Sequence, residues 1–183
     1  MKAKKLLVGV VSLFALTACG EVKPEEFKEE FSKIEEHTYS SATIKYSYDT
    51  DFIVKSKGDG TIDYKFENGK WTTSSSDAKA SDYMDLLTPV KGSDAALATI
   101  DTEGYDNKVE VKYYTNPFKI KATYEETTDK DGTKGSVKLE AISQFDKYGY
   151  LTVTSLDLRI KATSDGSTLE TYMKYNVKIS YKD

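Results

Sequence analysis

The sequence has few of the side chains that most catalytic and metal sites require. Its 183 residues include one cysteine, Cys19, and one histidine, His37. Nucleophilic triads and zinc sites need several such groups at defined spacings, and no phosphate-binding glycine loop occurs. His37 lies near the end of a predicted helix, where a polar residue is common. We therefore expect a protein that is not an enzyme and that has no metal or cofactor.

The sequence also lacks an apolar run long enough to cross a bilayer as a helix, which takes roughly 20 residues. Its longest apolar run, Leu6–Leu16, follows the basic start MKAKK. A basic start followed by a short apolar run is typical of a secretory signal peptide, which is cleaved from the mature protein. We predict that residues 1–18 form such a signal.

The apolar run ends in an aliphatic residue, two small residues and a cysteine: Leu16, Thr17, Ala18 and Cys19. This segment resembles the lipobox of bacterial lipoprotein precursors. The resemblance implies that the first three residues direct the signal peptidase and that Cys19, carrying a diacylglyceryl group and palmitate, begins the mature chain. Two acyl chains hold a protein firmly at a bilayer. The expected location is the extracytoplasmic side of the cell membrane, with the lipid as anchor and the membrane as partner.

Acidic residues outnumber basic ones in the part that remains after cleavage. Loss of Lys2, Lys4 and Lys5 with the signal changes the formal charge from −4 to −7. A net negative chain is repelled by nucleic acid, so we expect no nucleic-acid partner. The lone cysteine is used for the lipid, so no disulfide stabilises the fold, which must rely on its core.

The order of patterns predicts one domain behind a short tether. We expect residues 19–24 to form the lipidated N-terminus and tether, and residues 25–183 to form a single domain. Phe27, Phe31 and Ile34 have the spacing of one face of an amphipathic helix that follows Pro24. Because the tether has no long flexible stretch, the domain should sit close to the membrane.

Most of the domain alternates apolar and polar residues with a period of two, which is typical of strands with one buried face. We expect an antiparallel sheet of about eight strands, because every strand has one polar face. The segment KGDG (57–60) is interpreted as a turn, Asn68–Gly69 as a hairpin turn, and a bulge is expected near residues 154–156. Ten aromatic residues share the buried parity: Tyr46, Tyr48, Tyr64, Phe66, Tyr113, Phe118, Tyr124, Phe145, Tyr175 and Tyr181.

The middle of the chain departs from this pattern. A polar stretch leads to Ser81 and Asp82, which are favourable helix caps, and Ser93 is a candidate cap for a second short helix. We predict a helical insertion at about 81–100 that packs, with the first helix, on the apolar face of a curved sheet. The predicted class is α+β.

Two functions remain open. The first is a membrane-proximal module that binds a hydrophobic or amphiphilic small molecule; the second is a cell-surface structural or adhesion protein that binds an envelope or host macromolecule. The order of elements is similar in outline to the LolA-like and LppX-like lipid carriers, which implies only a fold. Because the aromatic rings can fill a core, we expect a mainly filled interior with a modest pocket under the insertion near Tyr64, Trp71 and Tyr83.

Overall fold

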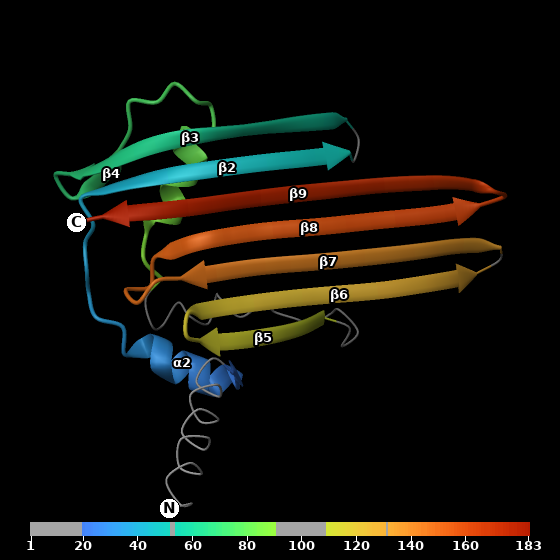
Figure 1. Cartoon of the computed structure of the whole chain (residues 1–183), viewed down its shortest axis with the longest axis horizontal. Helices are drawn as coiled ribbons and strands as arrows, with labels where there is room; N and C mark the ends of the chain where they lie inside the picture. The colour runs from blue at the N-terminus through green and yellow to red at the C-terminus, as the bar shows by residue number, and fades with distance from the viewer. Residues whose placement is uncertain (1–19, 52–53, 91–108, 131) are drawn as a thin grey trace, which may run out of the picture.

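The computed structural model describes residues 20–51, 54–90, 109–130 and 132–183, and in these residues nine strands form one antiparallel sheet (Figure 1). The order across the sheet is β1-β5-β6-β7-β8-β9-β2-β3-β4, and the sheet is open rather than closed into a barrel. The strands are β1 (Glu21–Val22), β2 (Ser41–Asp51), β3 (Lys55–Glu67), β4 (Lys70–Thr72), β5 (Val109–Thr115), β6 (Phe118–Lys130), β7 (Thr133–Phe145), β8 (Leu151–Ser164) and β9 (Ser167–Lys182). Three short helices complete the described fold: α2 (Pro24–Ser32), α3 (Ala80–Met84) and the 3-10 turn η2 (Asp85–Leu87).

The strand register separates an apolar face from a charged face. Ile44 of β2 lies opposite Ile62 of β3 and Ile179 of β9, and residues directly opposite one another share a face. We call this side the inner face. The next residue, Lys45, lies opposite Thr61 and Lys178 on the other side, which we call the outer face. This alternation is typical of an antiparallel sheet with one solvent-exposed face.

Helix α2 packs on the inner face across β5, β6 and β7. Phe27 and Phe31 are fully buried, and the Phe31 ring lies 5.2 Å from Phe118 and 5.4 Å from Phe145, both edge to face. Tyr113 and Ile120 complete this cluster. Because Pro24 stands at the first helical position, its missing N–H costs the helix nothing.

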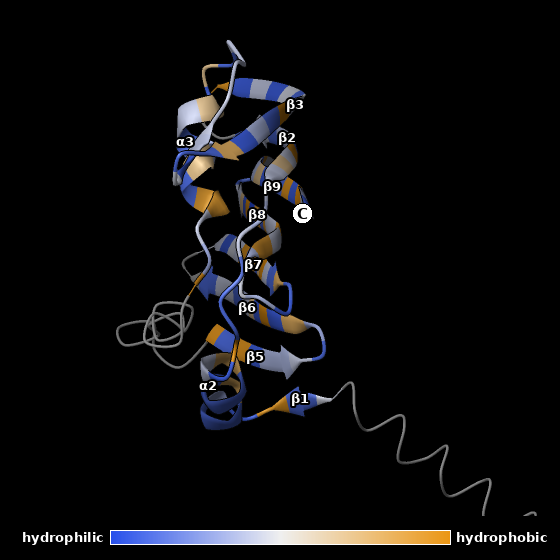
Figure 2. Cartoon of the chain, turned by 90° about the vertical axis from the view of Figure 1, so that its left-hand side faces the viewer, coloured by the Kyte–Doolittle hydropathy of each residue, from blue (hydrophilic) through white to orange (hydrophobic). Residues whose placement is uncertain are grey.

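The second cluster lies under α3 and η2, on the inner face of β2, β3 and β9. Leu87 of η2 is fully buried there against a group of apolar strand residues: Ala42, Ile44, Ile62, Tyr64, Val177 and Ile179. Figure 2, which views the sheet edge-on, shows α3 standing on one side of the strands. Leu151 packs against both clusters and so joins them into one core.

The described helices cover only one end of the sheet. The hairpins that join β6 to β7 and β8 to β9 project on the right of Figure 1, beyond α2 and α3. The inner face continues there with large apolar side chains, and Leu169 is 69% exposed and Tyr175 37%. The outer face carries ion pairs such as Lys121–Glu140 and Lys138–Glu125. Within the described ranges this half of the sheet is a single layer.

The structure corrects several details predicted from the sequence. The described residues form nine strands instead of about eight, and one of them, the two-residue β1, adds to the edge beside β5. The segment KGDG is the middle of β3 and not a turn. The register shift lies between Gln144 and Phe145, opposite Leu151–Val153, and not at residues 154–156. The helical part of the insertion begins at Ala80, one residue earlier than expected.

Other predictions fall on residues outside the described ranges. These are the signal sequence with Leu16, Thr17, Ala18 and Cys19, and the second helix of the insertion expected after Ser93. Across the ranges that are described, none of the helices is both long and apolar enough to cross a membrane.

Candidate functional site

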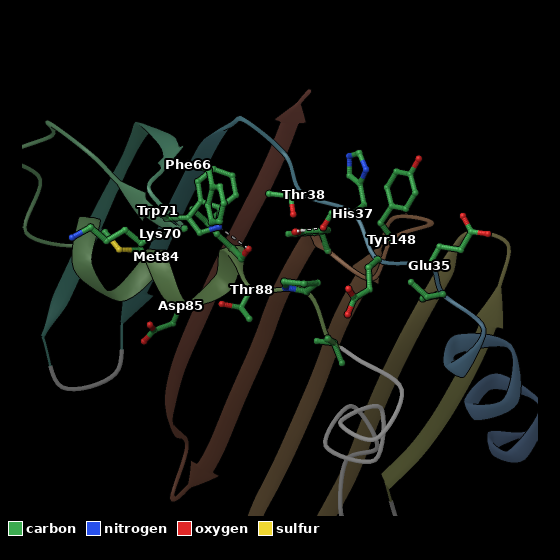
Figure 3. Close-up of a pocket in the computed structure, with 17 residues that line it drawn as sticks. Glu35, His37, Thr38, Phe66, Lys70, Trp71, Met84, Asp85, Thr88 and Tyr148 are labelled. Atoms are coloured by element: carbon green, nitrogen blue, oxygen red, sulfur yellow. Dashed lines mark hydrogen bonds between the residues drawn. The ribbon is translucent and has the colours of Figure 1, made fainter.

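A cavity of about 770 Å³ opens at the end of the sheet that the helices cover. It lies where four segments meet: the linker after α2, the β3–β4 hairpin, the stretch from η2 to Val90, and the turn between β7 and β8 (Figure 3). Its volume falls in the range of about 300 to 1,000 Å³ that is usual for small-molecule sites. The lining residues are Ile34, Glu35, Glu36, His37, Thr38, Phe66, Gly69, Lys70, Trp71, Met84, Asp85, Leu87, Thr88, Pro89, Val90, Tyr148 and Tyr150.

The turn between β7 and β8 is held by one carboxylate. Oδ1 of Asp146 accepts hydrogen bonds from the backbone N–H groups of Tyr148 (2.8 Å) and Tyr150 (3.0 Å). Its Oδ2 accepts a third from the hydroxyl of Tyr39 at 2.7 Å. Gly149 adopts φ +79°, a conformation that suits glycine. Asp146 therefore fixes the position of two lining tyrosines.

His37 forms the adjoining wall by stacking on Tyr148. The two ring centroids are 4.0 Å apart with an interplanar angle of 15°. The hydroxyl of Tyr150 donates to the backbone carbonyl of His37 at 2.9 Å, and His37 Nε2 lies 2.7 Å from Asp183 Oδ1. Figure 3 shows the His37 and Tyr148 rings side by side on one rim of the cavity. The imidazole thus contacts a carboxylate and an aromatic ring, which suits a structural role.

Phe66 and Trp71 form the opposite wall on the β3–β4 hairpin. Asn68 and Gly69 both have positive φ, as a tight hairpin turn requires, and the turn places Trp71 beside Phe66 with centroids 5.2 Å apart. The indole N–H of Trp71 donates to the carbonyl of Leu87 at 3.1 Å. This bond ties the hairpin to η2, so the ring is held in place.

The third wall joins the insertion to the β7–β8 turn. The N–H of Val90 donates to the carbonyl of Gly149 at 3.0 Å. Ile34 and Val90 supply aliphatic surface inside the cavity. Hydrogen bonds therefore connect all four of the described segments around the cavity.

Charged groups stand around the rim rather than inside. Glu35, Glu36 and Asp85 are exposed lining residues, and Lys70 is the lining lysine. In Figure 3 the Glu35 and Asp85 carboxylates point outward on opposite sides, and Lys70 extends away from His37 and Tyr148. Lys147 adds a further cation beside the rim, with its Nζ 4.6 Å from the ring centroid of Tyr148, so the described rim carries charges of both signs.

Tyrosines behind the cavity stay neutral over a wide pH range. Burial is the main cause that raises the pKa of Tyr181 far above its usual value, with the Asp146 carboxylate adding to the effect. Burial and the hydrogen bond to Asp146 likewise raise the pKa of Tyr39. These hydroxyls therefore act as permanent donors that brace the cavity, since an anionic phenolate is disfavoured there.

Of the three residues predicted to line a pocket, only Trp71 does so. Tyr64 is 1% exposed, and its hydroxyl donates to the carbonyl of Ala80 at 2.8 Å, so it supports α3 from inside the core. Tyr83 packs on Tyr46 with ring centroids 5.0 Å apart. The cavity beside the insertion therefore includes one of the three residues, whereas Tyr64 and Tyr83 meet the sheet from under α3.

The sequence did not reveal His37, Asp146 or Tyr148 as parts of the site. His37 was interpreted as a residue at the helix end, yet α2 ends at Ser32 and His37 belongs to the linker beyond it. The segment Asp146–Tyr150, DKYGY, does contain a local signal, since Asp and Gly at this spacing favour a turn. The contact between Tyr148 in this turn and His37 joins residues far apart in the sequence, and no local sequence pattern indicates it.

Within the described ranges, no group of three or more histidine, cysteine, aspartate or glutamate side chains is arranged to hold a metal ion. Comparisons with protein families, with curated proteins and with solved structures find no match to this chain. The site is therefore interpreted from its own geometry.

Proposed function

We propose that the chain is a membrane-anchored bacterial lipoprotein that binds a hydrophobic or amphiphilic small molecule in the cavity between His37 and Trp71. The observation that carries the proposal is the cavity itself, about 770 Å³ with aliphatic and aromatic lining and polar groups at its rim. A pocket of mixed lining suits a ligand with one apolar and one polar end.

The braced walls support a binding role. Trp71 is held by Leu87, Val90 by Gly149, and the His37 carbonyl by Tyr150. A site whose walls are fixed before binding does not lose conformational entropy when the ligand arrives, so more of the contact energy contributes to affinity.

The expected lipid anchor would place this cavity near the membrane. Strand β1 begins at Glu21, two residues after Cys19, and it pairs with β5 at the edge of the sheet. The linker that lines the cavity follows α2, which is only nine residues long. A diacylated Cys19 would therefore hold the domain on a very short tether.

A non-enzymatic role fits the chemistry of the cavity. Nε2 of its histidine lies 2.7 Å from Oδ1 of Asp183 and the ring stacks on Tyr148, and we interpret both contacts as structural. General base catalysis needs the base within hydrogen-bond reach of the hydroxyl or water that it activates.

The direct test is to purify the domain from Gly20 onward after expression in a bacterial host, and to analyse it by native mass spectrometry and solvent extraction. The proposal expects added mass that organic solvent removes, or uptake of an added amphiphile in a one-to-one ratio. A clean apo mass that stays unchanged after incubation with amphiphiles contradicts it.

The uncovered half of the sheet favours the second function, a surface protein that binds an envelope or host macromolecule. Its inner face presents Leu169 and Tyr175 to solvent, and its outer face presents rows of charged side chains. This function predicts that a Leu169→Lys variant loses adhesion to the partner while it still takes up any small molecule in the cavity.

A further inference from the structure

We propose that a second copy of this chain pairs with β3, antiparallel and about a two-fold axis through Gly58, so that the sheet continues from one molecule into the next. The proposal concerns the edge of the sheet and does not depend on what the cavity binds. Three features carry it: an open strand edge, the direction of its backbone groups and the order of the charges along it.

Most of β3 has a neighbouring strand on one side only. In Figure 1, β3 and β4 form the upper border of the sheet. β2 pairs with β3 from Lys55 to Lys65, whereas β4, the one described strand on the other side, pairs with Lys65–Glu67 alone. The carbonyl of Asp63 is covered as well, because it accepts a hydrogen bond from the hydroxyl of Thr73 at 2.7 Å. Within the described ranges, the segment Lys55–Thr61 is therefore an exposed strand edge, and such an edge is a template for another strand.

The backbone of this segment is oriented for pairing. In an antiparallel ladder, both backbone groups of a residue point to the same neighbouring strand, and successive residues alternate. The N–H of Phe66 donates to the carbonyl of Ser40, on the β2 side, at 2.8 Å. Even-numbered residues of β3 therefore bond to β2, and odd-numbered residues direct their N–H and C=O groups outward, as the hydrogen bonds at Asp63 and Lys65 show. The outward groups of the open segment are those of Lys55, Lys57, Asp59 and Thr61.

The charges on this edge complement a second copy in one register. The side chains of Lys57 and Asp59 are both exposed. With the axis at Gly58, Lys57 of each copy lies directly opposite Asp59 of the other, in the kind of pair that exchanges two backbone hydrogen bonds. Opposite charges at directly opposed positions stabilise a sheet, and like charges destabilise it. The register therefore forms two favourable charge pairs at the centre of the interface.

The other registers are unfavourable. An axis at any charged residue of the segment places that residue opposite its own copy, and an axis at Ser56 opposes Lys55 with Lys57. An axis at Gly60 or later brings Asp63 into the pairing, although its outward carbonyl is already bonded. An axis between two residues opposes outward backbone groups with inward ones. Gly58 is the axis that remains.

Gly58 itself suits a position on the axis. It meets its own copy in a pair without backbone hydrogen bonds, in which the two Cα atoms approach to about 4.5 Å. Glycine has no side chain to hinder this approach. The ring of Tyr48 covers Gly58, where a Cβ would lie 2.7 Å from the tyrosine hydroxyl oxygen. The Tyr48 rings of the two copies therefore extend the inner face across the axis.

The dimer should be weak in solution. Only one short segment of each copy takes part, and interfaces that bury little area are typical of transient complexes. We expect a dissociation constant of about 1 to 100 µM. Measurements of folding and ligand binding below this range report on the monomer. Anchoring of both copies in one membrane would raise their effective concentration.

A charge exchange tests the register. The full chain is purified from a bacterial host in a density-matched detergent, and sedimentation equilibrium at about 10 to 300 µM gives the protein mass of its complexes. We expect dimers for the wild type and monomers for Lys57→Asp and for Asp59→Lys, because each variant opposes like charges. An equimolar mixture of the two variants should form dimers again, since both opposed pairs in the mixed complex have opposite charges.

Lys45→Asp is the matched control and should keep the dimer. Lys45 is exposed on the outer face of β2, which lies between β3 and β9 and away from the open edge. Lys57→Asp removes only an exposed ion pair with Asp49, so the variant should still unfold cooperatively in urea. A carbodiimide, which joins a lysine to a carboxylate in contact with it, should link two wild-type copies through Lys57 and Asp59.

The outcomes decide the proposal without reference to the cavity. Lysines on a strand edge also serve to keep sheets apart, and a wild-type chain that stays monomeric at the highest concentration would assign them that role and overturn the dimer. Dimers in both single variants would place the interface elsewhere, and a monomeric mixture would exclude this register. Each of these results overturns the proposal and leaves the small-molecule function standing.

Discussion

Tyr46 of β2 lies over Gly60 of β3 so closely that a Cβ on the glycine would be 2.6 Å from a ring carbon of the tyrosine. The hydroxyl of Tyr46 donates to Asp77, which also accepts a hydrogen bond from the N–H of Lys79 at 2.9 Å. Because Lys79 directly precedes α3, the bare glycine backbone, the tyrosine and the insertion form one connected arrangement.

Gly60→Ala should therefore loosen the insertion. The new methyl group displaces the Tyr46 ring and its bond to Asp77, and overpacking of this kind costs about 1 to 3 kcal/mol of unfolding free energy. Gly58→Ala is the matched variant, because Tyr48 covers Gly58 in the same way but lies outside the core cluster. Gly58→Ala should lower the unfolding free energy by less than about 1 kcal/mol, because alanine is more favourable than glycine within a strand and this offsets part of the overpacking. Urea unfolding measures both; equal losses would contradict the assigned role of Tyr46.

Asp146→Asn should damage the cavity as well as the fold. The amide cannot accept all the hydrogen bonds that the carboxylate receives from Tyr39, Tyr148 and Tyr150, and a bond to a charged group contributes about 1.5 to 3 kcal/mol. We expect a lower melting temperature and weaker ligand binding reported by Trp71. Asp59→Asn, an exposed outer-face change, is the control and should alter neither.

Tyr64 makes the fold sensitive to alkaline pH. Burial raises the pKa of Tyr64 to about 12 from its usual 10.0. A folded-state pKa above the unfolded one contributes stability that is complete below about pH 10 and is lost as the pH approaches 12. The urea midpoint should therefore decrease across this window.

Tyr64→Phe separates the hydroxyl from the ring. The variant should lose about 1 to 3 kcal/mol near neutral pH, because the Ala80 carbonyl is left without its donor, and its midpoint should depend less on pH above 10. Tyrosinate absorbance followed alongside unfolding checks the assignment. If the urea midpoint of the variant depended on pH as strongly as that of the wild type, ionisation of another tyrosine would cause the alkaline loss of stability.

Phe31→Ala should cost about 3 to 5 kcal/mol, the range for removal of a fully buried ring. Phe31 lies between Phe118 and Phe145, so its loss leaves a void under α2. Phe31→Leu fills part of that void and should cost clearly less. Thermal and urea unfolding of both variants provide the measurement, and a negligible effect of the alanine variant would mean that α2 does not stabilise the sheet.

Cys19→Ala should release the protein from the membrane of a bacterial host. The thiol that receives the lipid is then missing, so incorporation of labelled palmitate should fall to background. Ala18→Gly keeps a small residue beside the cleavage point and should be processed and retained normally. Membrane retention of the Cys19 variant would overturn the proposed anchor.

Periodicity in the sequence was enough to predict the antiparallel sheet and the shared face of its aromatic residues. Tyr46, Tyr48 and Tyr175 do lie on the inner face, as their register with Gly60, Gly58 and one another shows. The same glycines misled the turn prediction. Glycine in KGDG signals a turn locally, but here it makes room for two tyrosine rings from the neighbouring strand.

The cavity was predictable only in part, because a local sequence pattern does not reveal contacts between distant segments. Trp71 follows a hairpin turn that the dipeptide Asn68–Gly69 specifies locally. His37 and Tyr148, by contrast, are brought together because β2 pairs with β9, β9 with β8 and β8 with β7. The position of Tyr64 beneath Ala80 likewise depends on where the insertion folds back, which no local pattern encodes.

Among the described residues, the strands β8 and β9 run from an end that the helices cover to an end that no described helix covers, and their amide protons should record that difference. Those of Ile44 and Ile179 lie beneath η2 and α3 and exchange only when the core opens. Thr163 and Thr168, near the β8–β9 tip, are paired in the same sheet but lie outside both core clusters of the described residues. One strand should therefore show slow exchange at one end and fast exchange at the other, so the hairpin tips can open and close again many times while the core beneath the helices stays folded.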